Sequence, residues 1–343
     1  MKKKYSLKDI AERSGVSVGT VDRVIHKRGR VSKESIEKVS EALKELNYTP
    51  NPVARSLRNN KHYKINVLIP DPKKDSYWIP CEKGIEEVIM EFRAFNLQID
   101  VQKYSPSSPR SFASARKEIL RNNPDAILFV PLFDKESELL LKKLNKMNIT
   151  TVTFNSPPRK GNNKFVGQDL FLSGRVAAKL IQKSIPSSSE IAIIHIDESI
   201  NNSIHMQNKE KGFKNYFESE NDNRHIHVLT TKTEEIEISL ENLLEENPNL
   251  QAFFVTTSKS YKVVNAIEKL GIQAKVVGYD LLEENINYLL NGSIEYLIHQ
   301  MPKLQASISL RGIIENLLFN KVLFHKQLLP IEIINSENVK SYL

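Results

Sequence analysis

Asp280 is the residue whose type and position indicate the clearest chemistry. It follows an apolar run that ends at Tyr279, and Gln300 comes twenty residues later, after a further apolar run. A carboxylate at the end of a strand can accept hydrogen bonds from two adjacent hydroxyl groups, and such charge-assisted bonds are the stronger kind. Tyr77 and Trp78, the only tryptophan, could offer flat apolar surface to the C–H face of a sugar ring. These residue types suit a polyhydroxylated ligand.

The sequence lacks the common signatures of catalytic and metal sites. None of its 12 glycines belongs to a GxxxxGK[ST] or GxGxxG motif, and neither GxSxG nor HExxH occurs. Cys81 is the only cysteine, which excludes an internal disulfide and a multi-cysteine metal site. We therefore expect a protein that is not an enzyme and has no metal site or cofactor.

The positive charge is concentrated at one end of the chain. Residues 1–64 contain 16 Lys/Arg and 7 Asp/Glu, a net charge of +9, whereas the remaining 279 residues contain 33 and 34, a net charge of −1. This asymmetry indicates a polyanion-binding module joined to a neutral domain with another task. The length of 343 residues suits a small module followed by a large α/β unit.

Three short helices are predicted at the N-terminal end. A helix over 7–14 is followed by Gly15, where a helix end needs a left-handed residue, and Ser17 is a suitable N-cap for a helix over 18–25. Two short helices joined by a tight turn with glycine form a helix-turn-helix. A third helix is expected over about 33–47, because its apolar residues recur at helical spacing.

A fourth, very short helix is predicted where Asn51 precedes Pro52. Asparagine is a favoured N-cap and proline a favoured first helical residue, so residues 53–58 should be helical. Six residues are too few for a stable helix in water. We expect this hinge helix to order only against another partner, and Arg55 and Arg58 indicate that the partner is phosphate.

One set of motifs runs through residues 5–58 almost without a gap. Its members are Ser6-Leu7-Lys8-Asp9-Ile10-Ala11, Gly15-Val16-Ser17, Thr20-Val21-x-Arg23-Val24, Val31-Ser32 and Asn47-Tyr48-x-Pro50-Asn51-Pro52-x-Ala54-Arg55-Ser56-Leu57. Together they resemble the lactose-repressor family of regulators. The resemblance implies that the helix from Val18 enters the major groove of operator DNA. It also implies that the hinge helix enters the minor groove, where an apolar wedge, here Leu57, can unstack a base step and kink the duplex.

The same resemblance implies individual roles in DNA binding. Arg23 is the best candidate for a guanine contact, because its guanidinium matches the O6/N7 edge, and Ser17 and Thr20 are expected at phosphates. The first two residues of this helix usually set base preference but offer no side-chain hydrogen bond here. Asp22 stands where serine is common; it could accept from cytosine N4, orient Arg23 or be a solvated carboxylate. The expected DNA contacts are Ser17, Val18, Gly19, Thr20, Asp22, Arg23, Ala54, Arg55, Leu57 and Arg58.

Behind the hinge, short apolar runs alternate with amphipathic stretches. Strands are expected at 65–70, 97–102, 126–130, 150–154, 190–196, 225–229, 251–255, 274–278 and 294–298. This alternation predicts an α/β fold of doubly wound parallel sheets with helices on both faces. The strands are too many for one sheet, so we expect two lobes. Domains are expected at 1–50 (helix-turn-helix), 51–63 (hinge helix and linker) and 64–343, the last comprising lobes at 64–166 and 167–299 and a remainder that crosses back.

The two-lobed region resembles the periplasmic sugar-binding proteins. The segment Val276-Val277-Gly278-Tyr279-Asp280 and the later Gln300 carry this resemblance, and in such proteins the aspartate and the glutamine bind ligand hydroxyls. In open α/β sheets ligands bind beyond the carboxyl ends of strands, which places the site in a cleft between the lobes. Tyr77 and Trp78 follow the first strand, where the family has aromatic residues.

Three weaker ligand candidates depart from the pattern of those proteins. Asn155 stands where aspartate is frequent, Lys209 where arginine is usual and Thr257 where asparagine is common. Gln168 and Asp169 border the junction of the lobes. The expected ligand-binding residues are Tyr77, Trp78, Asn155, Lys209, Thr257, Asp280 and Gln300.

These features predict a homodimeric transcription factor, a repressor, whose affinity for operator DNA is controlled by a small-molecule effector such as a sugar. Polar residues follow Met1–Lys4 where a signal peptide needs an apolar segment, and no apolar run is of membrane-spanning length. We therefore expect a cytoplasmic protein without membrane contact. The alternative is a constitutive DNA-binding regulator with a vestigial effector cleft; a sugar kinase with a helix-turn-helix is disfavoured by the missing glycine motifs. Whether the effector releases or tightens DNA binding stays open.

Removal of residues 1–62 should abolish operator binding and leave the rest of the chain folded, because the excess positive charge lies in that segment. For the full-length protein, operator affinity should fall steeply with salt, since each neutralised phosphate releases counterions. Mobility-shift assays of both proteins between 50 and 200 mM salt, roughly the range over which such losses are large, measure this. Operator binding by the truncated protein would contradict the assignment of the module.

Overall fold

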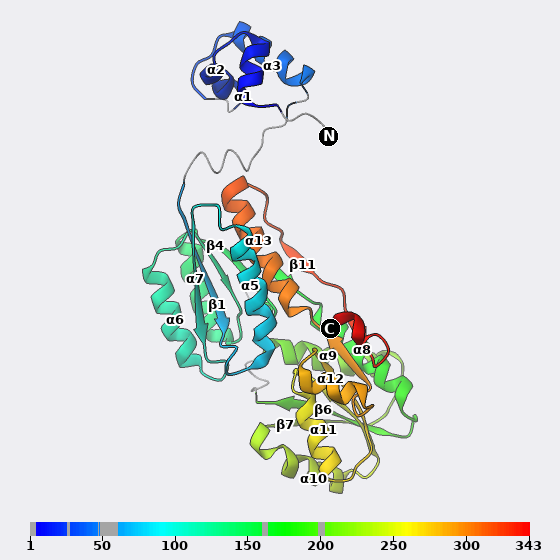
Figure 1. Cartoon of the computed structure of the whole chain (residues 1–343). Helices are drawn as coiled ribbons and strands as arrows, with labels where there is room; N and C mark the ends of the chain where they lie inside the picture. The colour runs from blue at the N-terminus through cyan, green and yellow to red at the C-terminus, as the bar shows by residue number, and fades with distance from the viewer. Residues whose placement is uncertain (1–4, 26–27, 47, 49–60, 160–163, 198–202) are drawn as a thin grey trace. The chain divides into compact units, whose positions relative to one another are not determined.

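The computed structural model describes residues 5–25, 28–46, 48, 61–159, 164–197 and 203–343. The chain divides into two units, Met1–Asn59 and Asn60–Leu343 (Figure 1). The residues expected to form the hinge helix, 53–58, lie outside the described residues.

The first unit contains three helices in its described part: α1 (Leu7–Ser14), α2 (Val18–Ile25) and α3 (Lys33–Glu45). Helix α1 begins with a capping box formed by Ser6 and Asp9 and ends at Gly15, whose φ of 66° is left-handed. The core is small: Ile10, Val21 and Val39 are fully buried and bring the helices together. The expected helix-turn-helix is confirmed.

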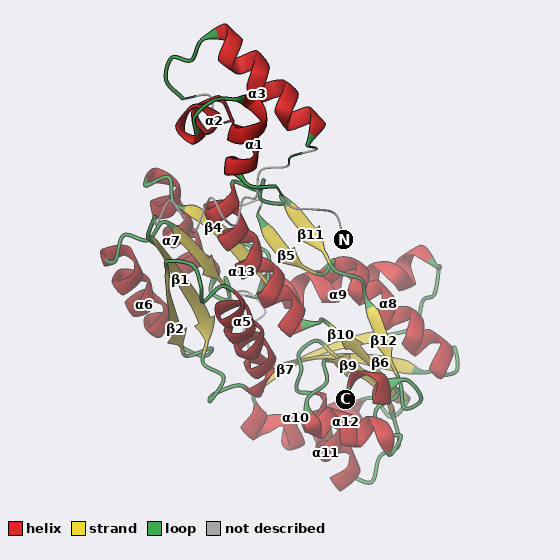
Figure 2. Cartoon of the chain, turned by 45° about the horizontal axis from the view of Figure 1, so that its top comes forward, coloured by secondary structure: helices red, strands yellow, loops and turns green. Residues whose placement is uncertain are grey.

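The second unit is built on two sheets with helices packed on their faces (Figure 2). The sheet of the first lobe has six parallel strands in the order β11-β5-β4-β3-β1-β2. Their bounds are β1 Tyr63–Pro70, β2 Leu97–Tyr104, β3 Ala126–Phe129, β4 Thr150–Phe154, β5 Phe165–Gly167 and β11 Lys326–Leu328. The helices with buried residues in this lobe are α5 Ile79–Glu91, α6 Pro109–Arg121, α7 Asp134–Lys146 and α13 Pro302–Phe319.

The sheet of the second lobe has the strand order β12-β10-β9-β8-β6-β7, and β12 alone among these strands is antiparallel to its neighbour. Their bounds are β6 Glu190–Ile196, β7 Ile226–Thr231, β8 Leu250–Val255, β9 Lys275–Tyr279, β10 Tyr296–His299 and β12 Glu332–Ile334. The helices of this lobe are α8 Leu170–Ser184, α9 Ile204–Ser219, α10 Ile236–Glu246, α11 Ser260–Lys269 and α12 Glu283–Leu290.

The expectation of two doubly wound, largely parallel lobes is confirmed. Strands such as β1 and β6 are buried almost throughout, because helices cover both faces of a parallel sheet. Three strands were missed in the sequence, β5, β11 and β12. Each has three residues, too few to show an alternating pattern.

The chain passes between the lobes at three places: between β5 and α8, between β10 and α13, and between β11 and β12. Gln168 lies in the first connection and is buried. Its Nε2 donates hydrogen bonds to the carbonyl oxygen of His299 at 2.9 Å and to that of Pro330 at 2.7 Å. One side chain therefore joins all three connections.

Gln168→Leu should lower the free energy of unfolding by about 1–3 kcal/mol, because it leaves two carbonyl groups in a buried setting without their donor. The measurement is denaturant unfolding of the full chain. Gln98→Leu is the control, since Gln98 is exposed and its side chain donates to Asp100 on its own strand. Equal unfolding free energies for the two variants would show that Gln168 does not hold the connections together.

Candidate functional site

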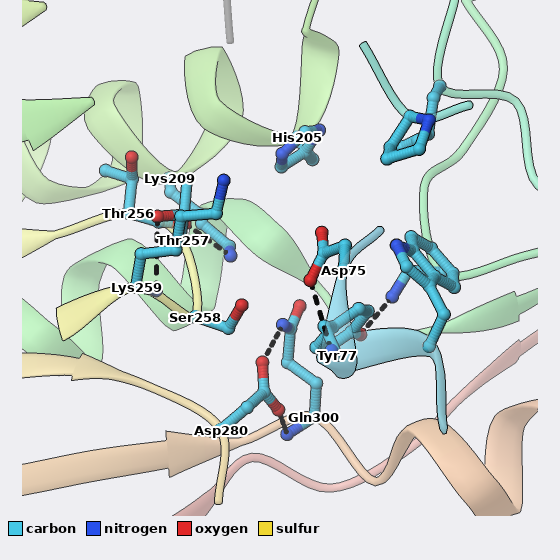
Figure 3. A pocket seen from close by; sticks show the side chains of 14 residues that line it. Asp75, Tyr77, His205, Lys209, Thr256, Thr257, Ser258, Lys259, Asp280 and Gln300 are labelled. Carbon is cyan, nitrogen blue, oxygen red and sulfur yellow. Dashed lines mark hydrogen bonds between the residues drawn. The ribbon is translucent and has the colours of Figure 1, made fainter. Parts of the chain in front are cut away.

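A cavity that is partly open to solvent lies between residues of both lobes (Figure 3). The structure brings together in its wall all seven residues that the sequence singled out for ligand binding: Tyr77, Trp78, Asn155, Lys209, Thr257, Asp280 and Gln300. The remaining lining residues were missed: Asp75, Pro106, Leu132, His205, Thr256, Ser258 and Lys259. The position of 256–259 directly after β8 could have revealed three of them, Thr256, Ser258 and Lys259, because ligands bind beyond the carboxyl ends of strands.

The second-lobe wall is formed by a buried carboxylate with fixed hydrogen bonds. Asp280 follows β9 and is 2% exposed. Gln300 donates to it twice, from its backbone N to Oδ1 at 2.9 Å and from Nε2 to Oδ2 at 2.6 Å. The carbonyl oxygen of Gln300 accepts from Gln305 Nε2 at 2.6 Å, so the glutamine is itself held in place. Each carboxylate oxygen retains acceptor capacity toward the cavity.

The first-lobe wall is aromatic. The Asp75 side chain accepts from Tyr77 N at 3.1 Å and caps the short 3₁₀ helix η1, Ser76–Trp78. The rings of Tyr77 and Trp78 meet edge to face with centroids 4.8 Å apart. The Tyr77 hydroxyl accepts from Asn155 Nδ2. Burial, and next the charge of Asp280, raise the pKa of Tyr77 well above its ordinary value, so this hydroxyl stays neutral.

Asn155 and Asp280 end strands of different lobes, β4 and β9, in the same backbone conformation. Their φ angles are 69° and 64°, in the left-handed region. Asparagine and aspartate are the residues besides glycine that adopt this region most readily. The strand ends therefore turn sharply at the cavity and place both side chains in its wall.

Lys209 is a buried cation in this wall, 2% exposed. Its ammonium group donates to the carbonyl oxygen of Thr256 at 2.8 Å and lies 3.4 Å from the centroid of the Tyr279 ring, a cation–π contact. Two glycines allow its helix, α9, to approach α8 closely: a Cβ on Gly174 would lie 2.0 Å from Lys209 O, and one on Gly212 would lie 1.9 Å from the carbonyl oxygen of Phe171. This packing brings Lys209 to the cavity.

In the first unit, the described residues expected at DNA belong to α2 and the turn that precedes it. Ser17, Val18, Gly19 and Arg23 are exposed, and Thr20 and Asp22 are half-buried, whereas Val21 faces the core. The Ser17 hydroxyl accepts from Thr20 N at 3.1 Å and fixes the start of the helix. Ala54, Arg55, Leu57 and Arg58 lie outside the described residues.

A helix-turn-helix unit joined to two α/β lobes around a polar cavity defines a DNA-binding regulator with a binding-protein domain. Residues 66–318 match the periplasmic binding protein domain family, and residues 6–51 match the bacterial regulatory proteins of the lacI family. The chain belongs to the periplasmic binding protein domain family. With its lacI-type DNA-binding domain, it is a transcriptional regulator of the lacI family, which confirms the resemblance seen in the sequence.

Individual relatives agree with this assignment. The chain is 25% identical over 312 residues to the sucrose operon repressor of Lactococcus lactis subsp. lactis, covering 90% of this chain and 93% of that protein. The crystal structure of a candidate LacI transcriptional regulator from Bacteroides fragilis has a TM-score of 0.78 and 25% identity, covering 82% of this chain and 100% of that one. A periplasmic solute-binding protein from Actinobacillus succinogenes 130z, solved with bound D-allose, has a TM-score of 0.70 and 21% identity over 82% of this chain and 100% of its own, which shows a shared fold.

Two further observations concern the described residues alone. Among them, no three His, Cys, Asp or Glu side chains are grouped so that they could hold a metal ion. No helix that the structure describes is both long and apolar enough to span a membrane.

The left-handed backbone at Asp280 predicts a difference between two substitutions. Asp280→Asn should be more stable to unfolding than Asp280→Ala by about 1 kcal/mol, because asparagine tolerates this region and can still accept from Gln300 N. Thermal unfolding of both variants measures the difference. Equal stabilities would mean that the backbone at this strand end imposes no such requirement.

Proposed function

We propose that this regulator is a repressor whose affinity for operator DNA is set by a sugar bound between its lobes. The observation that carries the proposal is the cavity itself, in which a buried carboxylate of one lobe faces the aromatic wall of the other. The names of the relatives support it, since one is a sucrose operon repressor and a solute-binding protein of the same fold was solved with D-allose. A regulator of this kind acts in the cytoplasm and is not an enzyme.

In this proposal Asp280 accepts hydrogen bonds from neighbouring ligand hydroxyls, and Gln300 holds it and adds a polar contact. Trp78 and Tyr77 pack on the C–H face of the sugar ring. Asn155, Lys209 and Thr257 supply the remaining polar contacts from the lining. Most of these groups are buried and hydrogen-bonded in the protein, which suits a site that selects a ligand by its pattern of hydroxyl groups.

On the DNA side, helix α2 reads the major groove. Arg23 contacts guanine, Ser17 and Thr20 contact phosphates, and Asp22 orients Arg23 or accepts from cytosine. The exposed Val18 and Gly19 approach base edges without side-chain hydrogen bonds. The hinge residues Ala54, Arg55, Leu57 and Arg58 bind the minor groove with Leu57 as the wedge. A homodimer presents two such modules to a near-palindromic operator.

In this proposal, successive segments of the chain have separate functions. Residues 1–50 bind DNA, 51–63 form the hinge, and 64–343 bind the effector. The effector changes operator affinity only to the extent that it binds one arrangement of the lobes better than another, because it shifts the equilibrium by its differential affinity. Either direction, release or tightening, is compatible with this principle.

The test begins with a thermal-shift panel of D-ribose, D-allose, D-galactose and sucrose on the full chain. A sugar that raises the unfolding temperature should also change the fluorescence of Trp78, the only tryptophan. Asp280→Asn should weaken its binding by about ten- to a hundredfold, because hydrogen bonds to a charged acceptor contribute roughly 1.5–3 kcal/mol. Operator affinity of this variant without sugar should stay within about twofold of the wild type, as distant sites act independently.

The thermodynamic coupling between sugar binding and operator binding gives a stricter test. Whatever factor the sugar changes operator affinity by, operator must change sugar affinity by the same factor. Calorimetric titrations of the sugar with and without operator measure both. Identical sugar affinities in the two titrations, or operator binding that no panel sugar alters, would favour a constitutive regulator with a vestigial cleft.

A further inference from the structure

A histidine that does not line the cavity lies directly behind its wall. His195 is near the end of β6 and is fully buried. Its Nδ1 lies 2.7 Å from Thr256 Oγ1, and its Nε2 lies 2.9 Å from Glu210 Oε2. The imidazole thus connects β6 to the segment after β8 and to helix α9. An apolar residue here would remove one hydrogen-bond partner from Thr256 and one from Glu210, and the loss of a hydrogen bond in a buried setting is costly.

The charge of Glu210 determines which nitrogen of His195 carries a proton. The hydrogen bond from His195, with burial opposing it and Lys214 assisting, lowers the pKa of Glu210 to about 2. Lys214 donates to its other oxygen at 2.7 Å. An ionised carboxylate only accepts hydrogen bonds, so Nε2 of His195 carries a proton and donates it. The imidazole is therefore held in one orientation, with Nδ1 directed at Thr256.

Thr256 connects the imidazole of His195 to a residue of the cavity wall, Lys209. Its hydroxyl lies between His195 and the carbonyl oxygen of Ile194, which it can reach at 3.2 Å. Its own carbonyl oxygen accepts from Lys209 Nζ at 2.8 Å. Lys209 precedes Glu210 on α9, so the contacts close a ring from His195 through Thr256 and Lys209 to Glu210. In this cycle of contacts, the ammonium group of Lys209 lies over the face of the Tyr279 side chain.

We infer that His195 is a positioning residue of the effector site: through Thr256 it fixes where the ammonium group of Lys209 lies in the cavity wall. The consequence for binding rests on the proposed function, whereas the positioning itself does not. Lys209 has a flexible stem with several rotatable bonds, and ordering such a side chain before the ligand arrives lowers the entropic cost of binding. His195 thereby affects affinity without touching the sugar.

Three variants separate the two contacts of His195. The terminal amide of glutamine reaches the position of Nε2, so His195→Gln retains a partner for Glu210 and loses the contact with Thr256. The shorter amide of asparagine lies near Nδ1, so His195→Asn retains the contact with Thr256. Thr256→Val removes the hydroxyl and keeps the shape of the residue. His227→Gln is the matched control, since His227 Nε2 bonds Glu190 Oε2 at 2.6 Å in the same sheet and His227 does not line the cavity.

The first measurement needs no sugar. In the full chain with ¹³C-labelled lysine, the Cε protons of Lys209 should be shifted upfield by the Tyr279 ring, and Lys209→Arg assigns their signal. His195→Gln and Thr256→Val should move this signal toward the position of solvent-exposed lysines. His195→Asn and His227→Gln should leave it in place. An unchanged Lys209 signal in His195→Gln would overturn the inference.

The second measurement is calorimetric titration with the panel sugar that raises the unfolding temperature of the wild type. His195→Gln and Thr256→Val should each weaken binding by about tenfold, the loss expected from one buried hydrogen bond. Their double variant should be no weaker than the weaker single one, because they break the same connection. His195→Asn should restore affinity to within about threefold of the wild type.

The outcomes distinguish the two proposals. If no panel sugar binds the wild type but the Lys209 signal still moves in His195→Gln, the effector proposal fails and the positioning role stands. If the losses of sugar affinity add up in the double variant, the two residues do not act through one connection and the inference is wrong. It is also wrong if His227→Gln weakens sugar binding as much as His195→Gln, because the effect is then a general loss of structure.

Discussion

A carboxylate as deeply buried as Asp280 is stable only where the protein supplies its hydrogen bonds, and this requirement organises the cavity. Gln300 supplies two of them, and the Nδ1 of His299 lies 3.7 Å from Oδ1. Both residues lie where the chain leaves β10 for the first lobe. The most polar acceptor of the site is thus tied to a connection between the lobes. A ligand that binds Asp280 therefore contacts a residue whose hydrogen-bond donor, Gln300, lies in the connection between β10 and α13.

The same segment meets Gln168, which bonds the carbonyl oxygen of His299 and also reaches Pro330 in the third connection. A short path therefore runs from the cavity to all three connections through Asp280, the 299–300 segment and Gln168. Two-state behaviour requires an element with alternative arrangements that the ligand can favour. The three connections that the Gln168 amide joins are where such alternative arrangements would have to arise. The first lobe begins with β1 at Tyr63, so a rotation of that lobe would move the start of β1, which follows the first unit along the chain.

Sequence reasoning succeeded where local patterns carry the information. The turn glycine and N-cap serine predicted α1 and α2, and long apolar runs predicted strands such as β4 and β6 with their observed bounds. It missed β5, β11 and β12, which exist because neighbouring strands offer them partners rather than because of their own pattern. It placed strand-end residues such as Asp280 correctly at the cavity wall, though their ligand contacts stay predictions. It did not find His195 and Glu210, because a contact between a strand and a helix leaves no spacing rule in the sequence.

The charges of the cavity bear on what kind of ligand it can hold. Two cations and two carboxylates line it, and each has a partner within the protein. Lys259 pairs with Asp197, Asp75 caps η1, Lys209 is held by Thr256 and the Tyr279 ring, and Asp280 by Gln300. The two cations and two carboxylates leave the lining without net charge, so a charged ligand gains no net electrostatic attraction from it. A neutral polyhydroxylated molecule adds hydrogen bonds to the remaining acceptors and donors and displaces none of them. The balance of charge thus favours a neutral sugar over a phosphorylated or acidic one.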